Sequence, residues 1–529
     1  MSLLSVTDLS VSINGTPLLE KVSFALQPGE IFGLVGESGS GKSLTALALM
    51  GLLPEGAVTT GHAELEGLDL LNQTERAMCG LRGNRIGMIF QEPMTALNPL
   101  MTIGDQVAET LMVHRALPRA EALAIAREKL DRVGLPEPRF GLGLFPHELS
   151  GGQRQRVAIA LAIALKPALL IADEPTTALD VMTQAQILGL LRGLVEDEGM
   201  GLLLITHDLA VVAGLANTTS VMQTGRIVEQ GPTEALFRAR KHPYTAALFA
   251  ASAHQPTRID IGLSVPLLEV DRALRAYTLA RPSAFAPRPV LHAVDGVSFT
   301  LHQRESLGLV GSSGCGKSTL TRAILGLDSL QGGEIRLSGT RVGPKLPNAL
   351  RAGMQVVFQD PYGSFNPRWR VDRLVAEPFH LLPKAPADWR DRVAEALVEV
   401  GLHPDDRRKY IHEFSGGQRQ RIAIARALIT RPDLIVLDEA VSALDVRIRA
   451  QVLDLLASLR RSHGLAYLFI SHDLSVVRAI TDRVLVMEAG RIVEEGPTEA
   501  LFAAPQHEVT RRLVAATPQI PAAWMEPQT

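Results

Sequence analysis

Cysteine is almost absent from this chain of 529 residues, which contains only Cys79 and Cys315. Two thiols in separate halves of the chain build no disulfide framework, and they cannot supply the four ligands of a thiolate metal site. The composition therefore excludes a disulfide-stapled scaffold and favours a reducing compartment.

An excess of charge of either sign is also missing. Lys and Arg together number 53 and Asp and Glu number 56, which gives a formal net charge of −3 at pH 7. Proteins that bind the backbone of nucleic acids normally carry a basic domain or stripe, whereas the basic residues of this chain are scattered among acids. The sequence therefore predicts no nucleic-acid partner.

Long hydrophobic runs are the third absence. No window of about 18 residues is uninterrupted, and even the apolar stretch 158–172 is broken by Lys166 and Pro167. The first residues lack the basic flank and apolar run of a secretory signal. We expect no membrane span and a cytoplasmic location.

What the chain has instead is one set of motifs, present twice in the same order. GESGSGKS, FQEP, LSGGQRQR, DEPTTALD and THD lie between Gly36 and Asp208, and GSSGCGKS, FQDP, FSGGQRQR, DEAVSALD and SHD lie between Gly311 and Asp473. From SGGQ onward the offset between the two copies stays constant. A repeat in fixed order indicates a duplicated domain.

The repeat predicts two large domains. We place the first over residues 1–250, a linker over 251–266, the second over 267–515 and a disordered tail over 516–529. The linker has weak periodicity and contains Pro256, and the tail carries three prolines.

Each half reads as an α/β fold built on a mostly parallel sheet. Short apolar runs such as ALLIAD, GLLLIT, LIVLD and AYLFI predict buried strands, and a strand, a glycine loop and a helix follow one another at each GxxxxGK[ST] motif. Between the FQ and SGGQ motifs, residues 102–134 and 371–401 show helical spacing of apolar residues. We predict an inserted helical subdomain there in each half.

The glycine loops predict phosphate binding. A glycine-rich turn that binds no ligand would explain one such loop. It does not explain two copies that each lie between a strand and a helix. Backbone N–H groups of the loop and helix start would face the phosphates, while Lys42 and Lys317 would reach the β- and γ-phosphates of ATP. The predicted nucleotide-binding positions are Gly36, Glu37, Ser38, Gly39, Ser40, Gly41, Lys42 and Ser43, and Gly311, Ser312, Ser313, Gly314, Cys315, Gly316, Lys317, Ser318 and Thr319.

Oxygen ligands for Mg²⁺ are predicted at three kinds of position. The hydroxyls of Ser43 and Ser318 follow the lysines, and Asp173 and Asp438 end apolar strands, where ligands of α/β folds collect. The side chains of Gln91 and Gln359, also at strand ends, could bind Mg²⁺ or the attacking water.

Catalytic groups are predicted beside these ligands. Glu174 and Glu439 would polarise the attacking water, provided that the backbone turns each glutamate away from the aspartate before it. A solvated strand end would explain an Asp-Glu pair by itself. His207 and His472 recur at one distance from the glutamates, which favours a contact with the γ-phosphate over a satisfied core histidine.

With the SGGQ segments, this motif set resembles the ATP-binding-cassette ATPases over nearly the whole chain. The resemblance implies that the two cassettes face each other head to tail and that each ATP lies between the glycine loop of one and the SGGQ of the other. Site one would add Ser415, Gly416, Gly417 and Gln418, and site two would add Ser150, Gly151, Gly152 and Gln153. Asp180 and Asp445 would contact the opposite cassette, and both sites would hydrolyse ATP.

The two halves depart from that pattern in two places. Ala440 stands where the first half has a proline, which removes a rigid turn but no reacting group. The aromatic platform expected under the adenine is Tyr277 in the second half, with Phe285 as the alternative, whereas the first half offers Ile13.

HPYTAAL, residues 242–248, is similar to the ATPases of peptide and nickel importers, although a helix start with Pro243 in its first turn would also explain it. Overall the chain most resembles the fused ATPase subunit of bacterial peptide and microcin C importers. The resemblance implies two transmembrane permease subunits, an extracytoplasmic solute-binding protein that acts indirectly, and a peripheral place on the inner face of the cell membrane. Several relatives have a cysteine cluster after HPYT that this chain lacks, so it implies no iron–sulfur site.

Another class of twin-cassette ATPase stays open as the alternative. Ribosome-acting proteins of this kind typically join their cassettes by a long charged helical linker, and the join here is short and weakly charged. DNA-repair relatives carry zinc-binding cysteines, which two cysteines cannot supply. The cargo cannot be identified from the sequence.

Overall fold

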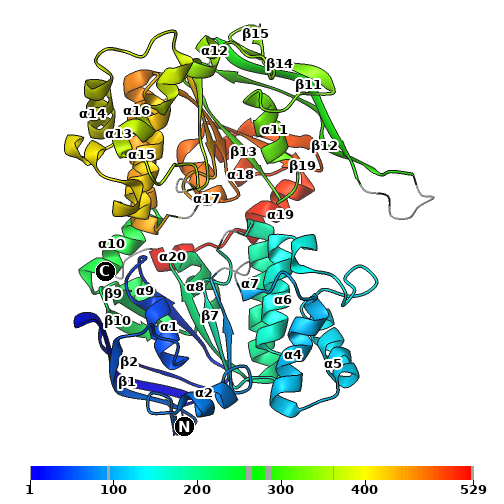
Figure 1. Cartoon of the computed structure of the whole chain (residues 1–529), viewed down its shortest axis with the longest axis vertical. Coiled ribbons are helices and arrows are strands. Elements are labelled where there is room, and N and C mark those ends of the chain that lie inside the picture. Colours follow the sequence, from blue (N-terminus) through cyan, green and yellow to red (C-terminus); the bar gives the residue numbers. More distant parts are fainter. Residues whose placement is uncertain are drawn as a thin grey trace. The chain divides into compact units, whose positions relative to one another are not determined.

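The computed structural model describes residues 2–525 except 92–95, 178, 258–264, 280, 282–286, 361–362 and 443 (Figure 1). The chain forms two compact units. The first comprises Met1–Leu179, Thr183–Ala253 and Pro518–Thr529, and the second comprises Asp180–Met182 and His254–Thr517.

The first unit contains ten strands and eleven described helices. Its strands are β1 (Leu4–Ile13), β2 (Thr16–Leu26), β3 (Ile31–Val35), β4 (Ala57–Leu65), β5 (Leu68–Asp69), β6 (Ile86–Ile89), β7 (Leu169–Asp173), β8 (Gly201–Thr206), β9 (Thr218–Gln223) and β10 (Arg226–Pro232). Its helices are α1 (Lys42–Leu49), α2 (Glu75–Leu81), α4 (Ile103–Arg115), α5 (Arg119–Arg132), the 3₁₀ helix η1 (Pro146–Glu148), α6 (Gly151–Ala162), α7 (Val181–Glu198), α8 (Leu209–Leu215), α9 (Thr233–Ala239), α10 (Pro243–Ser252) and α20 (Ala522–Met525).

The second unit repeats this order of elements. Its strands are β11 (Pro266–Thr278), β12 (Val290–His302), β13 (Ser306–Gly311), β14 (Gly332–Leu337), β15 (Thr340–Arg341), β16 (Met354–Val357), β17 (Leu434–Asp438), β18 (Ala466–Ile470), β19 (Arg483–Glu488) and β20 (Arg491–Pro497). Its helices are α11 (Lys317–Ile324), α12 (Asn348–Gly353), α13 (Val371–Val375), η2 (Glu377–Leu381), α14 (Trp389–Glu399), η3 (Pro404–Arg408), η4 (Ile411–Glu413), α15 (Gly416–Leu428), α16 (Val446–His463), α17 (Leu474–Ile480), α18 (Thr498–Ala503) and α19 (Glu508–Ala516).

The sheets have one topology in both units. A six-stranded sheet runs β10-β9-β3-β8-β7-β6 in the first unit, and the second has the equivalent order β20-β19-β13-β18-β17-β16. All neighbouring strands in these sheets are parallel except for the edge strands β10 and β20, which pair antiparallel with β9 and β19. The predicted parallel α/β core is therefore confirmed.

A second sheet in each unit was not predicted as a separate layer. It is antiparallel, with the order β2-β1-β4-β5 or β12-β11-β14-β15. Buried and exposed residues alternate along much of β4 and β14, as expected for a sheet that packs on the core with one face only.

Both faces of the parallel sheet are buried. In β7, Leu170 and Ala172 join the core that includes α4–α7, whereas Leu169 and Ile171 join the core shared with α1 and the antiparallel sheet. Successive strand residues point to opposite faces, so a continuous apolar run fills both cores.

The predicted helical subdomains are present, but they differ between the units. Figure 1 shows α4, α5 and α6 side by side in the first. In the second, the counterpart of the long α4 is the short α13 followed by η2. Pro378 explains the break, because proline cannot donate the hydrogen bond that would continue the helix.

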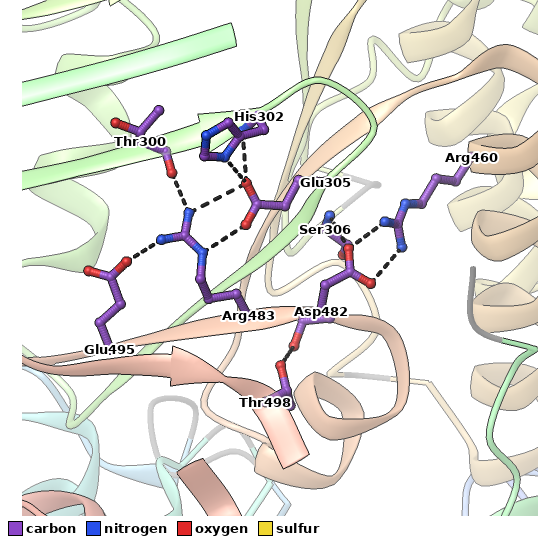
Figure 2. Close-up of polar contacts among 10 residues, drawn as sticks. Thr300, His302, Glu305, Ser306, Arg460, Asp482, Arg483, Glu495 and Thr498 are labelled. Atoms are coloured by element: carbon purple, nitrogen blue, oxygen red, sulfur yellow. Dashed lines mark hydrogen bonds and ion pairs between the residues drawn. The ribbon is translucent and has the colours of Figure 1, made fainter. Parts of the chain in front are cut away.

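An ionic network braces the second unit at the sheet edge opposite the glycine loop (Figure 2). The guanidinium of Arg483 donates to the buried carboxylate of Glu305 at 2.8 Å, and Asp482 accepts hydrogen bonds from Arg460 and from the Ser306 N–H. In the first unit, neutral Asn217 and Thr218 stand at the positions of Asp482 and Arg483. There Asn217 accepts from the Ile31 N–H at 2.9 Å, and Thr218 donates to Glu30 at 2.6 Å.

Residues 522–525 differ from the disordered tail that the sequence predicts over 516–529. Residues 522–525 form α20, and Trp524 and Met525 are half-buried against the cluster around Phe237 in the first unit. Apolar side chains between the prolines provide the contacts that compensate for the lost chain entropy.

Among the described residues, no helix combines the length and the hydropathy that a membrane crossing requires.

Candidate functional site

Each glycine loop joins the central strand of the parallel sheet to a helix, and its last glycine adopts a conformation that favours glycine. Gly41 and Gly316 have φ angles of 105° and 114°, and a β-carbon at Gly316 would lie 1.9 Å from the carbonyl oxygen of Ala293. A glycine has no side chain to cap α1 or α11, so the first N–H groups of each helix remain available to an anion.

The loop lysines lie over their own loops. Lys42 Nζ donates to the carbonyl oxygens of Gly36 and Glu37, both at 2.8 Å. Lys317 Nζ donates to those of Gly311 and Ser312 at 2.8 and 2.9 Å. Both ammonium groups are buried at the mouth of the loop, where exchanging a carbonyl for a phosphate oxygen would strengthen the hydrogen bond.

The strand-end aspartates lie beside the loops in environments that disfavour their charge. Asp173 Oδ1 accepts a hydrogen bond from Ser43 Oγ at 3.1 Å. Burial and the neighbouring Glu174 raise the pKa of Asp173, and burial together with Glu439 raises the pKa of Asp438 to about 6. Hydroxyl and carboxylate oxygens suit Mg²⁺, and the cation would offset the cost of burying these carboxylates.

Glu174 lies at the centre of a hydrogen-bonded group of side chains. Its carboxylate accepts from Gln91 Nε2 at 3.0 Å and from Thr177 Oγ1 at 2.9 Å, and it lies 3.1 Å from His207 Nδ1. Burial by itself would raise the pKa of Glu174, but the bond and charge of His207, followed by Thr177 and Lys42, lower it to about 2. The carboxylate is therefore fully ionised.

The second unit repeats this group with fewer members. Glu439 lies 3.2 Å from His472, and the contact with this histidine outweighs burial, so that the pKa of Glu439 is lowered and that of His472 is raised. Within the described residues, the polar contacts of the Glu439 side chain do not include Gln359. Ser442 replaces Thr177 and donates to the backbone carbonyl of Glu439 instead.

Both glutamates have a backbone conformation that is unusual for their residue type. The φ angles are 48° at Glu174 and 51° at Glu439, in the left-handed region that costs a non-glycine residue free energy. This turn at the strand end carries each glutamate away from the preceding aspartate. The two angles agree although Ala440 replaces a proline, so losing that proline leaves the turn unchanged.

The SGGQ segments begin helices α6 and α15 with a capping box. Ser150 Oγ accepts from the Gln153 N–H at 3.4 Å, and Gln153 Oε1 accepts from the Ser150 N–H at 2.9 Å. Ser415 and Gln418 make the same pair of bonds. The first and last residues of the motif thus fix where the helix starts.

The two glycines between them have different local surroundings. A β-carbon at Gly152 would lie 2.3 Å from Thr183 Cγ2, and one at Gly417 would lie 2.4 Å from Ile448 Cγ2, so the second glycine is needed for packing. A β-carbon at Gly151 or Gly416 would meet no atom closer than 3.9 Å. The first glycine therefore leaves the helix start open to a partner.

The HPYT segment forms a capped helix start, as its simplest interpretation predicts. His242 is the N-cap of α10 and Pro243 occupies the first turn. Tyr244 turns inward and touches the glycine loop of the same unit, because its hydroxyl accepts a hydrogen bond from the Glu37 N–H at 3.2 Å. Sequence reasoning missed this contact. Its one signal was that the second copy of the segment, HEVTRRL at residues 507–513, has Val509 where the first has Tyr244.

The candidate adenine platform lies at the end of a long hairpin. Tyr277 is 37% exposed in β11, where the Arg275 guanidinium lies 5.0 Å from its ring centroid. Ile13 is the equivalent residue at the end of β1. Phe285 lies outside the described residues, so the choice between Tyr277 and Phe285 stays a prediction.

Within each unit the structure thus brings the predicted phosphate, metal and catalytic residues to the carboxyl edge of one sheet. Thr177, which donates a hydrogen bond to Glu174, is a site residue that the sequence did not predict. The pairing of each glycine loop with the SGGQ segment of the other half stays a prediction.

Comparison with known proteins identifies this arrangement. The family model described as ABC transporter matches residues 19–177 and 294–442, which is more than half of the chain and includes both glycine loops. The chain belongs to the ABC transporter family. A second family model, described as the C-terminal region of oligopeptide/dipeptide transporters, matches residues 228–267, which include α9 and α10.

Two of the relatives match over nearly the whole of this chain. The glutathione import ATP-binding protein GsiA of Escherichia coli strain K12 is 46% identical over 547 residues, covering 96% of this chain and 88% of that protein. The peptidoglycan transport ATP-binding protein YejF of Agrobacterium fabrum is 48% identical over 534 residues, covering 98% and 97%. Among solved structures, the complex of the archaeal ribosomal stalk protein aP1 and the ribosome recycling factor aABCE1 matches with a TM-score of 0.62 over 96% of this chain and 92% of that chain. Its sequence identity is 21%, so this likeness shows the fold alone.

Proposed function

We propose that the chain is the ATP-hydrolysing subunit that energises uptake of peptides or peptide-like solutes through a membrane permease. The observation that carries the proposal is the oligopeptide/dipeptide transporter region on α9 and α10, directly after the first cassette. The relatives named for glutathione import and peptidoglycan transport support a peptide-like cargo.

In this proposal, the residues around each glycine loop bind either the phosphates of ATP or its Mg²⁺. Lys42 and the first N–H groups of α1 bind the phosphates of ATP, while Ser43 and Asp173 hold its Mg²⁺ with Gln91 nearby. Lys317, Ser318, Asp438 and Gln359 do the same in the second half. The Mg²⁺ supplies positive charge that neutralises the phosphate oxygens.

The glutamates act as general bases. Glu174 and Glu439 are ionised and held at the strand end, so each can accept the proton of the attacking water. His207 and His472 pair with these carboxylates and bind the γ-phosphate when it arrives. The contact with His207 lowers the pKa of Glu174 and so weakens it as a base in the paired state, and we expect ATP to draw His207 away from it.

Each site is completed by the other cassette. The exposed starts of α6 and α15 offer N–H donors behind glycines, which suits the phosphate of a nucleotide held by the opposite loop. ATP then closes the two cassettes on each other, and hydrolysis with phosphate release reopens them.

The partners are two permease subunits, and the chain lies peripherally on the inner face of the cell membrane. A solute-binding protein outside the cell would select the cargo. A cavity of about 700 Å³ in the second unit, lined by Gln359, Phe358, Glu377, His380 and Arg426 among others, lies between the catalytic glutamine and the helical subdomain. A permease segment that occupied this cavity could move Gln359.

Charge reversal tests the docking surface. Glu109 on α4 and Arg373 on α13 are exposed on the helical subdomains. Glu109→Lys and Arg373→Glu should abolish peptide uptake in reconstituted vesicles while the ATPase activity of the isolated chain stays unchanged. Glu196→Lys, which alters an exposed acid on α7, is the matched control and should transport normally.

The alternative is a twin-cassette ATPase that acts on ribosomes or DNA. Co-sedimentation of the purified chain with ribosomes or DNA, together with failure to bind any membrane permease, would overturn the proposal.

A further inference from the structure

Tyr244 connects the accessory helices α9 and α10 to the first phosphate-binding loop. Its side chain is only 6% exposed, and its hydroxyl accepts from the Glu37 N–H at 3.2 Å. On the other side of that residue, Lys42 Nζ donates to the Glu37 carbonyl oxygen at 2.8 Å. The loop residue that follows Gly36 is therefore held at its N–H by Tyr244 and at its carbonyl by the lysine.

These two bonds respond differently to a nucleotide. Lys42 must turn toward the phosphates when ATP binds, which releases the Glu37 carbonyl. The bond from the Glu37 N–H to Tyr244 does not involve the lysine and can persist. Tyr244 can thus keep the start of the loop in place while the ammonium group changes partner.

The HPYT sequence fixes the start of the helix that carries this tyrosine. His242 Nδ1 accepts from the Tyr244 N–H at 3.2 Å, and Glu229 accepts from the His242 N–H at 3.1 Å. Pro243 presets the backbone of the first helical residue. The histidine and proline therefore orient α10, and the tyrosine makes the contact with the loop.

The C-terminal segment, residues 518–525, packs against the same side-chain cluster. This cluster contains Val35, which immediately precedes the loop, together with Tyr244 and Phe237. The ring of Trp524 meets Phe237 edge-on at a centroid distance of 6.0 Å. Packing of the C-terminal segment is therefore continuous with the packing of Tyr244.

Two arginines complete the contact with the C-terminal segment. Arg238 donates to the carbonyl oxygen of Ala523 at 2.7 Å, and Arg240 donates to those of Trp524 and Met525 at 3.1 and 2.9 Å. Carbonyls at the end of a helix lack intrahelical partners, so cationic donors are well suited to them.

The second cassette lacks these features and serves as an internal comparison. By the constant offset of the repeat, Val509 stands at the position of Tyr244, and Ala503 and Pro505 stand at the positions of the two arginines. His507 still caps its helix, and Glu494 still accepts from the His507 N–H. The capped helix is thus common to both halves, whereas the contact with the loop belongs to the first half alone.

We propose that Tyr244 is a positioning residue for ATP at the first phosphate-binding loop, and that the C-terminal segment supports it by packing on the shared cluster. The proposal rests on the ATPase function proposed above. It assigns to the accessory region a role in nucleotide binding within its own cassette.

The test uses the full-length chain with Glu439→Gln. In this chain the remaining ATP turnover comes from the site built on the first glycine loop. Adding Tyr244→Phe removes one hydroxyl, and we expect the KM for ATP to rise about fivefold, the factor that one modest hydrogen bond is worth, while kcat stays within about twofold. Adding Trp524→Ala instead should raise KM by about twofold. Titration with a fluorescent ATP analogue should give the same order of affinities without turnover.

The controls separate positioning from folding. In the chain with Glu174→Gln, where turnover reports the second loop, Tyr244→Phe and Val509→Ala should leave KM unchanged. An unchanged KM and affinity in Tyr244→Phe, with or without a lower melting temperature, would overturn the role of the tyrosine. An unchanged KM in Trp524→Ala would overturn the supporting role of the C-terminal segment. If the Glu439→Gln parent binds the analogue but hydrolyses no ATP, the proposed ATPase function fails, and the titration still decides the role of Tyr244.

Discussion

Gln91 Nε2 donates a hydrogen bond to Glu174 Oε2 at 3.0 Å, which ties the loop after β6 to the residue after β7. The loop of Gln91 is therefore bonded directly to the proposed general base. Among the described residues of the second half, Gln359 and Glu439 share no such bond. The two proposed ATP sites thus differ in how tightly the proposed base is held.

Gln91→Glu tests this bond. A second carboxylate at hydrogen-bond distance from Glu174 makes the two acids share a proton, which raises the pKa of the pair. We expect ATP turnover at the first site to fall by at least about tenfold at neutral pH and its pH profile to shift upward. The matched change Gln359→Glu should shift the profile of the second site less, because Gln359 makes no bond to Glu439 among the described residues. Coincident profiles for Gln91→Glu and the parent chain would contradict the contact.

Asp438→Asn tests the burial of the carboxylate that we propose binds Mg²⁺. The folded pKa of about 6 exceeds the ordinary value of 3.8, so the ionised group destabilises the fold fully above pH 6 and progressively less as the pH falls toward 4. Without Mg²⁺ at pH 7.5, the variant should gain up to about 3 kcal/mol in the stability of the second unit. Calorimetric unfolding at pH 7.5 and 5 should show the gain shrinking at the lower pH, and an equal gain at both would refute the assignment. ATP turnover at the second site should be lost.

Arg483→Ala tests the network shown in Figure 2. Its partner Glu305 is 1% exposed, and removal of the arginine would leave that carboxylate buried without its cation, at a cost of about 3 kcal/mol or more. Thr218→Ala at the equivalent position of the first unit removes one hydrogen bond and should cost about 1 kcal/mol. Unfolding of the two variants measures both costs, and equal costs would show that the network adds nothing.

Much of the fold and site follows from the sequence because the motifs carry local physics. A glycine loop between a buried strand and a helix dictates its own conformation, and the ends of parallel strands must meet at one edge. The parallel core, the helical subdomains and the grouping of Lys42, Asp173, Glu174 and His207 were all predictable in this way.

Other features depend on contacts between distant segments, which local patterns do not encode. The left-handed conformation of Glu174 is imposed by the packed strand end, although glutamate has no preference for it. The contact of Tyr244 with Glu37 and the packing of Trp524 on Phe237 join residues more than 200 positions apart. Composition suggested a disordered tail, but apolar side chains outweighed its prolines.

Tyr277→Ala tests the adenine platform. Stacking of a base on an aromatic ring is worth roughly 1–3 kcal/mol, as measured for single-stranded nucleic acids, whereas an aliphatic side chain gives ordinary apolar contact. The variant should bind ATP at the Lys317 site about fivefold or more weakly, and Ile13→Ala should affect the Lys42 site less. Nucleotide titration of single-site chains measures both. Equal site affinities, or a loss with Phe285→Ala and not with Tyr277→Ala, would assign the platform elsewhere.

Steady-state ATPase measurements on the glutamate variants show whether both cassettes hydrolyse ATP with a strand-end glutamate as the base. Glu174→Gln and Glu439→Gln should each slow turnover at their own site by about 10²-fold or more while ATP still binds, because general-base catalysis contributes roughly 10² to 10⁴. The double variant should bind ATP, hydrolyse almost none and accumulate as a closed, ATP-loaded form. ATPase activity near that of the unmodified chain in the double variant would show that these glutamates are not the bases.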